Sequence, residues 1–335
     1  MTLRRRGVVG SLLFVLVACA CGTVPRPVEK QAAATVLPTA FALTTPSPLL
    51  NSGQPAPRAG AAIEYDPVSG QLLLMGGMAD PNAAGWATSG HDFWTWSPIR
   101  GWSHQTPSMM PMAGYLDAMV WDPGTRQVVL IPASGAGAWA WDGTAWKPSG
   151  PGVRSSGVTG AAYDAGDGVL LVLGRSAADG GETIWAWDGS RWAESRAPMS
   201  WREEGGVAYD LDRKQLVVYG GFGDADPQTW LWDGASWTSR RTDNYPTANQ
   251  SAAVYDPVRH QVLMYGPGGE TWTWDGLSWA LRSTTGPGIR RDQSMAFDSG
   301  LGQVVLFGGK SPMQGGEDFR NDLWAWDGAR WTQIG

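Results

Sequence analysis

Side chains that could carry out catalysis or bind a metal are few in this sequence and widely separated. The three histidines are His91, His104 and His260, and no two of them have the spacing of metal ligands. Adjacent carboxylates occur at Glu203-Glu204 and Glu317-Asp318, and pairs of carboxylates carry out glycoside hydrolysis. All these residues are predicted in loops or turns of the repeats described below, and adjacent acids on loops are usually only solvated. We therefore predict no catalytic residue, no metal site and no cofactor.

Residues 1–21 have the features of an export signal. Arg4–Arg6 form a basic start, and the apolar stretch 8–18 that follows is too short to span a bilayer as a mature helix. The stretch leads into Leu16-Val17-Ala18-Cys19, which resembles the lipobox of bacterial lipoproteins. That resemblance implies cleavage before Cys19, lipidation of its thiol, and attachment to the extracytoplasmic face of the bacterial cell membrane through the lipid alone. Lipidation of Cys21, or an ordinary secretory signal cut after Ala20, remains an alternative.

Composition limits the partners and the redox chemistry. Both cysteines lie in the export signal, so we expect neither a disulfide framework nor thiolate chemistry in the rest of the chain. The net charge of −6 argues against nucleic acid, whose phosphates require clustered Lys and Arg. Residues 22–57 are rich in Pro, Ala and Thr, which predicts a semi-extended linker ahead of the folded part.

The rest of the chain, 58–335, consists of six copies of one unit. Each copy contains an aromatic-Asp pair followed by a Leu- and Val-rich run, then a phrase related to Trp-x-Trp-Asp-Gly-x-x-Trp, which is weakest in the first copy (FWTWSPIRGW from Phe93). The aspartates of the aromatic-Asp pairs are separated by 42 to 56 residues; they are Asp66, Asp122, Asp164, Asp210, Asp256 and Asp298.

The residue pattern of each unit predicts four short strands. The first contains small residues, and the second is a buried apolar run such as Gln215–Tyr219. The third has Trp at alternate positions, as at Trp230 and Trp232, so both indoles lie on one face. Asp233-Gly234 then predicts a hairpin turn that brings Trp237 close to this Trp pair.

Four-stranded units of this length are typical of propeller blades. We therefore predict an all-β, six-bladed, monomeric β-propeller, with indoles between blades and Ala and Gly at the crowded axis. Because the units run in the same order throughout, the sixth blade is expected to pack directly on the first, unless the stretch before Pro57 adds an outer strand.

The repeats resemble kelch repeats and the central domain of the galactose oxidase family. The matching features are the glycine pairs Gly76-Gly77, Gly220-Gly221 and Gly308-Gly309, the aromatic-Asp turn and the Trp that opens the fourth strand. The resemblance would imply a copper site with a Tyr–Cys crosslink, but no cysteine follows Cys21, so that chemistry is not carried over. Pro132-Ala133, Gly174-Arg175 and Gly266-Pro267 replace the glycine pair in the other units, where a different turn is expected.

Binding is expected where the repeats differ. Loops between strands two and three and between blades vary in length and share one rim, and loops on a rigid scaffold commonly carry binding. The candidate ligand-binding residues lie before the first strands of the blades: Arg58, Tyr115, Trp201, Arg202, Glu203, Asn249, Arg291 and Asp292. Ion pairing among these side chains around the rim is the alternative.

These observations favour a non-catalytic binding propeller on the cell surface. Its ligand is expected to be an envelope protein or a glycan, held at the variable rim. A glycan-active hydrolase or lyase that uses rim carboxylates is one alternative, and a structural spacer without a specific ligand is another.

Overall fold

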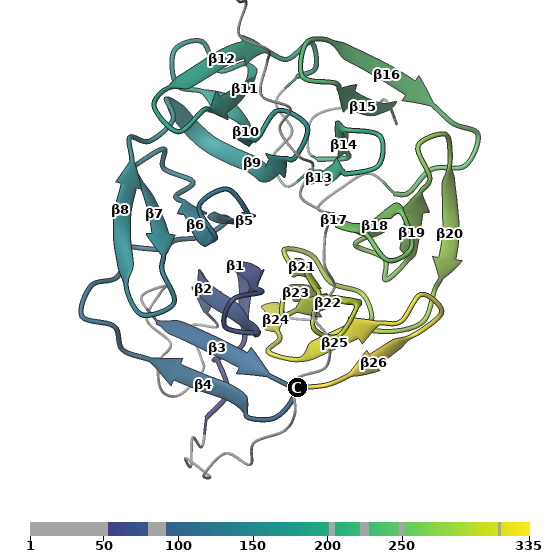
Figure 1. Ribbon diagram of the computed structural model, residues 1–335. Coiled ribbons are helices and arrows are strands. Elements are labelled where there is room, and N and C mark those ends of the chain that lie inside the picture. The colour runs from purple at the N-terminus through teal and green to yellow at the C-terminus, as the bar shows by residue number, and fades with distance from the viewer. Residues whose placement is uncertain (1–52, 80–91, 201–204, 222–227, 248–250, 314–315) are drawn as a thin grey trace, which may run out of the picture. The chain divides into compact units, whose positions relative to one another are not determined.

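The computed structural model describes residues 53–79, 92–200, 205–221, 228–247, 251–313 and 316–335. The described part of the chain contains strands and turns and no helix, and therefore no helix able to cross a membrane. Its strands form six four-stranded antiparallel sheets that surround a central axis (Figure 1). The predicted six-bladed β-propeller is confirmed.

Each blade consists of strands that are consecutive in the chain, numbered from the axis outward except for one inserted hairpin. Blade one contains β1 (Arg58–Asp66), β2 (Gln71–Ala79), β3 (Phe93–Ser97) and β4 (Gly101–Gln105). Blade two contains β5 (Ala118–Asp122), β6 (Gln127–Ile131), β7 (Ala138–Trp141) and β8 (Trp146–Gly150). Blade three contains β9 (Ser155–Asp164), β10 (Val169–Ser176), β11 (Glu182–Trp187) and β12 (Trp192–Arg196).

The second half of the ring follows the same order. Blade four contains β13 (Gly206–Asp210), β14 (Gln215–Tyr219), β15 (Gln228–Trp232) and β16 (Trp237–Arg241). Blade five contains β17 (Ala252–Asp256), β18 (Gln261–Tyr265), β19 (Thr271–Trp274) and β20 (Trp279–Ser283). Blade six contains β21 (Ser294–Asp298), β22 (Gln303–Phe307), β25 (Leu323–Trp326) and β26 (Trp331–Gln333), with the hairpin β23 (Lys310–Met313) and β24 (Gly316–Phe319) inserted before β25.

The hydrophobic core lies between the blades. Six clusters of buried side chains each combine residues of two neighbouring blades, because a single sheet cannot cover both of its own faces. The outer hairpins contribute tryptophans paired across the turn, such as Trp232 and Trp237, whose ring centroids are 5.3 Å apart. Burying one large aromatic side chain contributes about 2–3 kcal/mol, so the repeated indoles hold the blades together.

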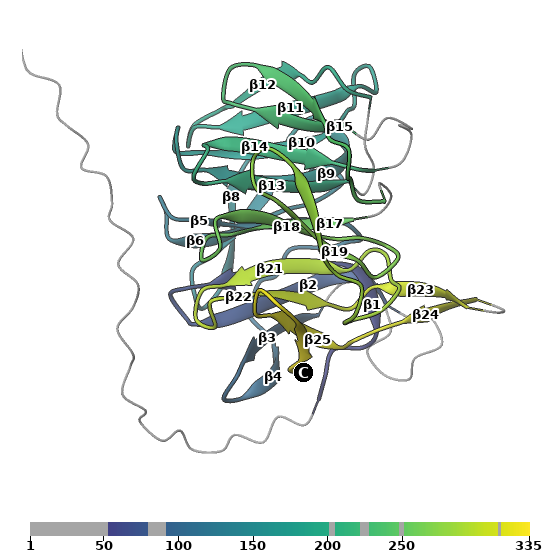
Figure 2. The ribbon, with the colours of Figure 1, turned by 90° about the vertical axis from the view of Figure 1, so that its right-hand side faces the viewer.

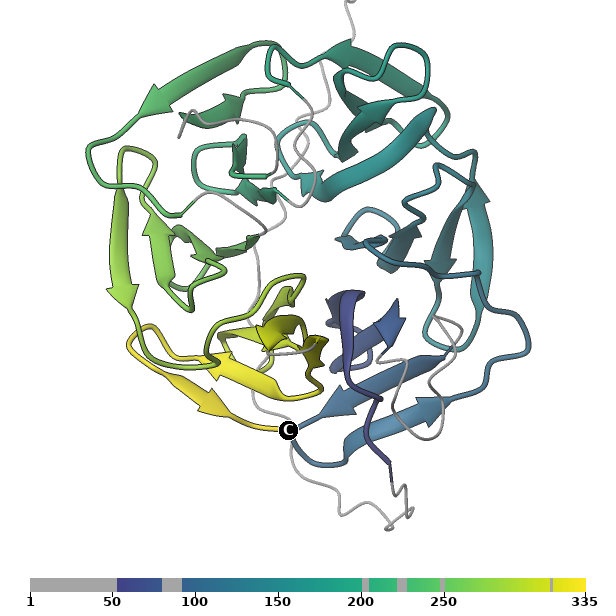
Figure 3. The ribbon, with the colours of Figure 1, turned by 180° about the vertical axis from the view of Figure 1, so that it is seen from behind.

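The ring closes without exchange of a strand between the chain ends. β1 packs beside β21, and backbone hydrogen bonds run from Arg58 N to Arg320 O at 2.8 Å and from Gly309 N to Arg58 O at 2.9 Å. The C-terminus lies at the boundary of blades one and six (Figure 3). Blade six thus packs directly on blade one, as predicted, and its four strands all come from the C-terminal unit.

Two local predictions were wrong. His104 lies in β4 rather than in a loop, and its ring is 4.9 Å from that of Trp94. Glu317 and Asp318 lie in β24 rather than in a loop. The polar β23–β24 hairpin projects from one face of the ring (Figure 2). Its two strands pair with each other, and one bridge joins Lys310 to Arg291, so no alternation of buried residues marks the hairpin in the sequence.

Candidate binding site

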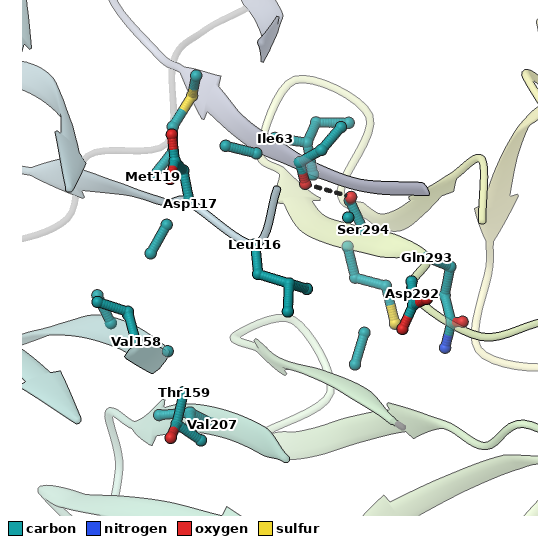
Figure 4. A pocket seen from close by; sticks show the side chains of 18 of the residues that line it. Ile63, Leu116, Asp117, Met119, Val158, Thr159, Val207, Asp292, Gln293 and Ser294 are labelled. Atoms are coloured by element: carbon teal, nitrogen blue, oxygen red, sulfur yellow. Dashed lines mark hydrogen bonds between the residues drawn. The ribbon is translucent and has the colours of Figure 1, made fainter. Parts of the chain in front are cut away.

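The first strand of every blade starts at the face that carries the variable loops and ends in the short aspartate turn on the other face. Its starting residues therefore surround one end of the central channel, the channel mouth. A cavity of about 170 Å³ lies there. Figure 4 shows that Leu116, Val158, Val207 and Asp292 surround one open space, with Gln293 and Ser294 beside Asp292.

Arg58 belongs to the framework of this face. Its side chain is only 2% exposed, and its two terminal nitrogens donate to the two carboxylate oxygens of Asp92, each at 2.6 Å. A third hydrogen bond reaches Gly76 O at 3.1 Å. Burial raises the pKa of Asp92, but the hydrogen bonds and charge of Arg58 outweigh it and hold that pKa below its usual value.

The same arrangement recurs in blade six. Arg290 is 1% exposed, donates to the two oxygens of Asp322 at 2.7 and 2.9 Å, and donates to Gly308 O at 2.9 Å. Arg58 is the first residue of β1, and Arg290 lies shortly before β21. In both blades the arginine thus connects the start of the blade to the glycine pair and to the residue before the third strand. This repeated role makes Arg58 a structural residue, and we do not include it in the binding proposal below.

Arg291 and Asp292 lie in a charged cluster beside the channel mouth. Arg291 forms an ion pair with Glu317 of the inserted hairpin. Lys310 Nζ lies 3.2 Å from Glu317 Oε2 and 3.5 Å from Asp292 Oδ2. Burial raises the pKa of Glu317, but Arg291 and Lys310 outweigh it and hold that pKa below its usual value, so this carboxyl is a poor proton donor at neutral pH.

Tyr115 belongs to the same cluster. Lys310 Nζ is 5.8 Å from the centre of the Tyr115 ring and 5.9 Å from that of Phe319, within the range of a cation–π interaction. The structure thus brings Tyr115, Arg291 and Asp292 together, as the sequence predicted for the rim. The ion pairs that the sequence analysis left as an alternative are also present.

The carboxylate of Asp292 has the fewest hydrogen bonds of any side chain in the cluster. The residue is 6% exposed, and neither of its carboxylate oxygens has a hydrogen-bond donor among the described residues. Its φ of +55° lies in the left-handed region, which is uncommon for a residue other than glycine. The neighbouring Gln293 is also 6% exposed and donates its amide to Tyr265 O at 3.0 Å, while its Oε1 has no hydrogen-bond partner in the part of the chain that the structure describes.

Other predicted residues lie outside the described part of the chain. These are Cys19, His91, Trp201, Arg202, Glu203 and Asn249. The remaining histidine, His260, is exposed in the turn before β18, with Nδ1 2.7 Å from Asp212 Oδ2. Within the described ranges, no three His, Cys, Asp or Glu side chains are grouped as metal ligands.

Two important residues were missed by the sequence analysis. Lys310 follows the last glycine pair and Gln293 follows Asp292, and neither belongs to the repeated phrases. The extra length between Gly309 and Leu323 is the one sequence signal for Lys310, because it shows that blade six carries an insertion on the variable side. Nothing in the sequence indicates that the Gln293 carbonyl lacks a donor.

The opposite face consists of short turns capped by their own aspartates. In the turn after β5, for example, Asp122 Oδ1 accepts hydrogen bonds from the backbone N–H of Gly124 at 2.8 Å and Thr125 at 3.3 Å. Each such carboxylate is occupied by its own turn. The recurring aspartates are therefore turn residues, as the repeat pattern indicated.

Comparison with known proteins adds no function. No family model matches the chain, and no curated protein matches it. Among solved structures, it is similar to a chain in the crystal structure of a nidogen/laminin complex, with 12% identity and a TM-score of 0.45. The similarity covers 64% of this chain and 75% of that chain, and a likeness this weak carries no argument about ligands.

Proposed function

We propose that this protein is a non-catalytic binding propeller of kelch-like type, held at the cell surface through a lipid on Cys19. Its ligand is an envelope protein or glycan, and it binds on the face that carries the variable loops. The lipobox-like sequence supports the location, and the six repeats with their glycine pairs support the kelch-like type.

The difference between the two faces of the ring is the observation that carries this proposal. On one face, short turns are closed by aspartates whose oxygens accept hydrogen bonds from their own backbones. The other face carries the inserted hairpin, a charged cluster and a cavity. Charged side chains beside a cavity on a rigid frame favour binding at that face.

Catalysis by the rim carboxylates is the less favoured alternative. Glu317 pairs with two cations, which hold its pKa below its usual value, so it lacks the raised pKa of a general acid. Asp292 forms an ion pair with Lys310. If the protein were a glycan hydrolase or lyase, Glu317→Gln would abolish the release of sugar from envelope glycans. We expect no such release from the unaltered protein.

A comparison of one substitution on each face tests the proposal. Arg291→Ala removes a cation from the variable face, and Arg191→Ala removes an exposed cation from the turn face. The full chain would be displayed on cells and crosslinked to envelope material, and the captured partner quantified. We expect Arg291→Ala to reduce capture about tenfold and Arg191→Ala to leave it unchanged. Equal capture by both variants would contradict binding at the variable face.

A further inference from the structure

Blade three differs from the other blades in the exposure of its outer tryptophans. Its pair, Trp187 and Trp192, lies across the hairpin with ring centroids 5.2 Å apart, and both side chains are partly exposed. In every other blade at least one member of the pair is buried, and all these tryptophans lie in the described ranges. The buried members are Trp96, Trp102, Trp141, Trp146, Trp232, Trp274, Trp279, Trp326 and Trp331.

The neighbouring blade two explains this exposure. The third strand of a blade packs against the outer tryptophans of the next blade, and β7 of blade two has Ala138 and Ala140 on the contacting face. At the position of Ala138 the other blades have larger side chains: Phe93, Ile184, Thr229, Thr271 and Leu323. The two alanines leave a cavity of about 70 Å³ between blades two and three, which are neighbours in the ring (Figure 1), and both indoles line it.

The alanine at position 138 also changes the hydrogen bond of Trp192. In blade five the equivalent residue is Thr271, whose hydroxyl accepts the indole N–H of Trp331 from the next blade at 2.7 Å, and blade four has the same bond. Ala138 offers no such acceptor. Trp192 instead donates to Pro151 O at 2.8 Å, which holds the indole in place without filling the cavity.

The cavity is open to solvent and combines apolar walls with a polar border. Thr125 and Ser149 border it and are exposed, and Gln127 is partly exposed. Its walls are the two indoles, the alanines of β7, and the side chains of Val129 and Leu170. Several water molecules fit in this volume, so part of a small ring can enter it.

An uncharged ligand suits this composition. Asp122 is the only charged residue of the lining among the described residues, and its carboxylate accepts hydrogen bonds from Gly124 N and from Thr125 Oγ1, each at 2.8 Å. A pyranose ring has faces of C–H groups that can stack on an indole, and an edge of hydroxyls that can bond to the Gln127 amide and the Ser149 hydroxyl. Apolar walls with a few polar groups are typical of small-molecule sites.

We propose that the cavity between blades two and three binds one pyranose ring of a glycan. The ring stacks against Trp187 and Trp192, and its hydroxyls bond to Gln127 and Ser149. The cavity shares no lining residue with the channel mouth, so it is a second site, beyond the one proposed for the variable face.

Methyl β-glucopyranoside is the probe for this site, because its ring hydroxyls are all equatorial and both of its faces carry only C–H groups. Calorimetric titration into the full chain, kept in a detergent without a sugar headgroup, should show saturable binding with a Kd in the millimolar range. Sorbitol has similar hydroxyls but no rigid apolar face, and it should not bind. Absence of glucoside binding would overturn the proposal. Tighter binding of Nα-acetyl-leucine methylamide would overturn it in favour of an apolar side chain of a protein.

Trp192→Ala removes one wall of the site, and we expect at least tenfold weaker binding of the glucoside. Trp237→Ala is the matched control, since Trp237 has the same repeat position in blade four, is also partly exposed and does not line the cavity. It should leave binding unchanged, and circular dichroism would verify the fold of both variants. Equal affinity of the two variants would overturn the site.

Ala138→Thr tests the site without removing an aromatic side chain. The new hydroxyl should accept the indole N–H of Trp192, as Thr271 accepts that of Trp331, and the added atoms should close the cavity. We expect at least tenfold weaker binding and no loss of stability in urea unfolding. Unchanged binding by this folded variant would contradict the proposal. Capture of a partner at the variable face does not depend on this cavity, so the two proposals are tested separately.

Discussion

The repeated aromatic-Asp pair joins a turn to the neighbouring blade. Asp164 Oδ1 accepts the backbone N–H of Gly166 at 2.8 Å and of Asp167 at 3.1 Å. Tyr209, from the aromatic-Asp pair of the next blade, donates its hydroxyl to the same carboxylate. One side chain thus closes its own turn and fastens the adjacent sheet, which explains the recurrence of the pair without a role in binding.

Glu64 departs from this pattern of structural side chains. It lies two residues before Asp66, where the other blades have Val120, Ala162, Ala208, Val254 and Ala296. Burial raises the pKa of Glu64 to about 7, although the backbone N–H groups of Tyr65 and Trp121 oppose the rise. The folded protein therefore holds a proton here at a pH where the unfolded chain has lost it.

This carboxyl should make stability fall as the pH rises. The favourable contribution is fully present below the unfolded pKa of about 4.3 and is lost as the pH passes through the folded pKa. Between pH 5 and pH 8 we expect the unaltered protein to lose about 2 kcal/mol relative to Glu64→Gln, after allowing for screening by channel water. Urea unfolding at each pH measures the difference in unfolding free energy between the two proteins. The contributions of all other titrating groups cancel in this difference. Parallel pH profiles would show that Glu64 is not protonated in the folded state.

Arg58 marks the limit of sequence analysis for single residues. The repeats place it at the same distance from Asp66 as Arg290 is from Asp298, although Arg58 is the first residue of β1 and not a residue before that strand. The sequence does not reveal that Asp92, 34 positions away, lies within 2.6 Å and removes the guanidinium from the surface. The position of a residue within the repeat predicts which part of the blade it lies in. Its exposure also depends on side chains that follow loops of irregular length, and the repeat does not predict these.

At the scale of elements, the first strands of blades six, one and two are linked in series near the channel mouth. Gly60 N donates to Asp292 O at 2.7 Å, and Leu116 N donates to Gly60 O at 2.8 Å. All three residues have positive φ, at +63° for Gly60, +61° for Leu116 and +55° for Asp292. Of these three linked positions, only the one at Gly60 has glycine, the residue that adopts positive φ most easily.

Gly60→Ala should be more damaging than an ordinary glycine substitution. The added Cβ would lie 2.4 Å from two ring atoms of Tyr115, in addition to the strain of positive φ. Gly101 has nearly the same φ, +65°, and nothing within 4 Å of an added Cβ, so Gly101→Ala isolates the backbone strain. We expect about 1 kcal/mol of destabilisation for Gly101→Ala and about 3 kcal/mol for Gly60→Ala in urea unfolding. Equal losses would mean that Tyr115 moves aside freely.

The inserted hairpin shows why some elements were not predicted. Regular blade strands carry either a continuous apolar run or aromatic residues at alternate positions, since they are buried on at least one face. β23 and β24 are rich in polar and charged residues and have no such pattern. Their pairing depends on ion pairs such as Lys310 with Glu317, and on the backbone link between Arg291 and Lys310, which only the assembled ring provides.

At the scale of the whole molecule, the ring is a closed series of blades, and within the described ranges no disulfide and no strand exchanged between blades joins the chain ends. Gly53, Gln54, Ile334 and Gly335 line one cavity together with Trp96 and Trp102, so the two ends of the propeller lie close together. Each blade is contiguous in sequence, and each interface between blades has its own apolar cluster. The position of the chain ends should therefore matter little to the fold.

A circular permutant tests this view. Joining Gly335 to Gly53 by a short Gly-Ser linker, and opening the chain between Asn244 and Tyr245, moves the break from one interface between blades to another. Tyr245 is 47% exposed, and all six blades remain contiguous. We expect the circular dichroism and tryptophan fluorescence of the parent, and an unfolding free energy within about 2 kcal/mol of it, since the same side chains are buried. Opening the same linked chain between Leu263 and Met264, both fully buried in β18, should prevent folding because it divides a core strand. If the first permutant also failed to fold, the original boundary between blades six and one would hold a stabilising feature that the other interfaces lack.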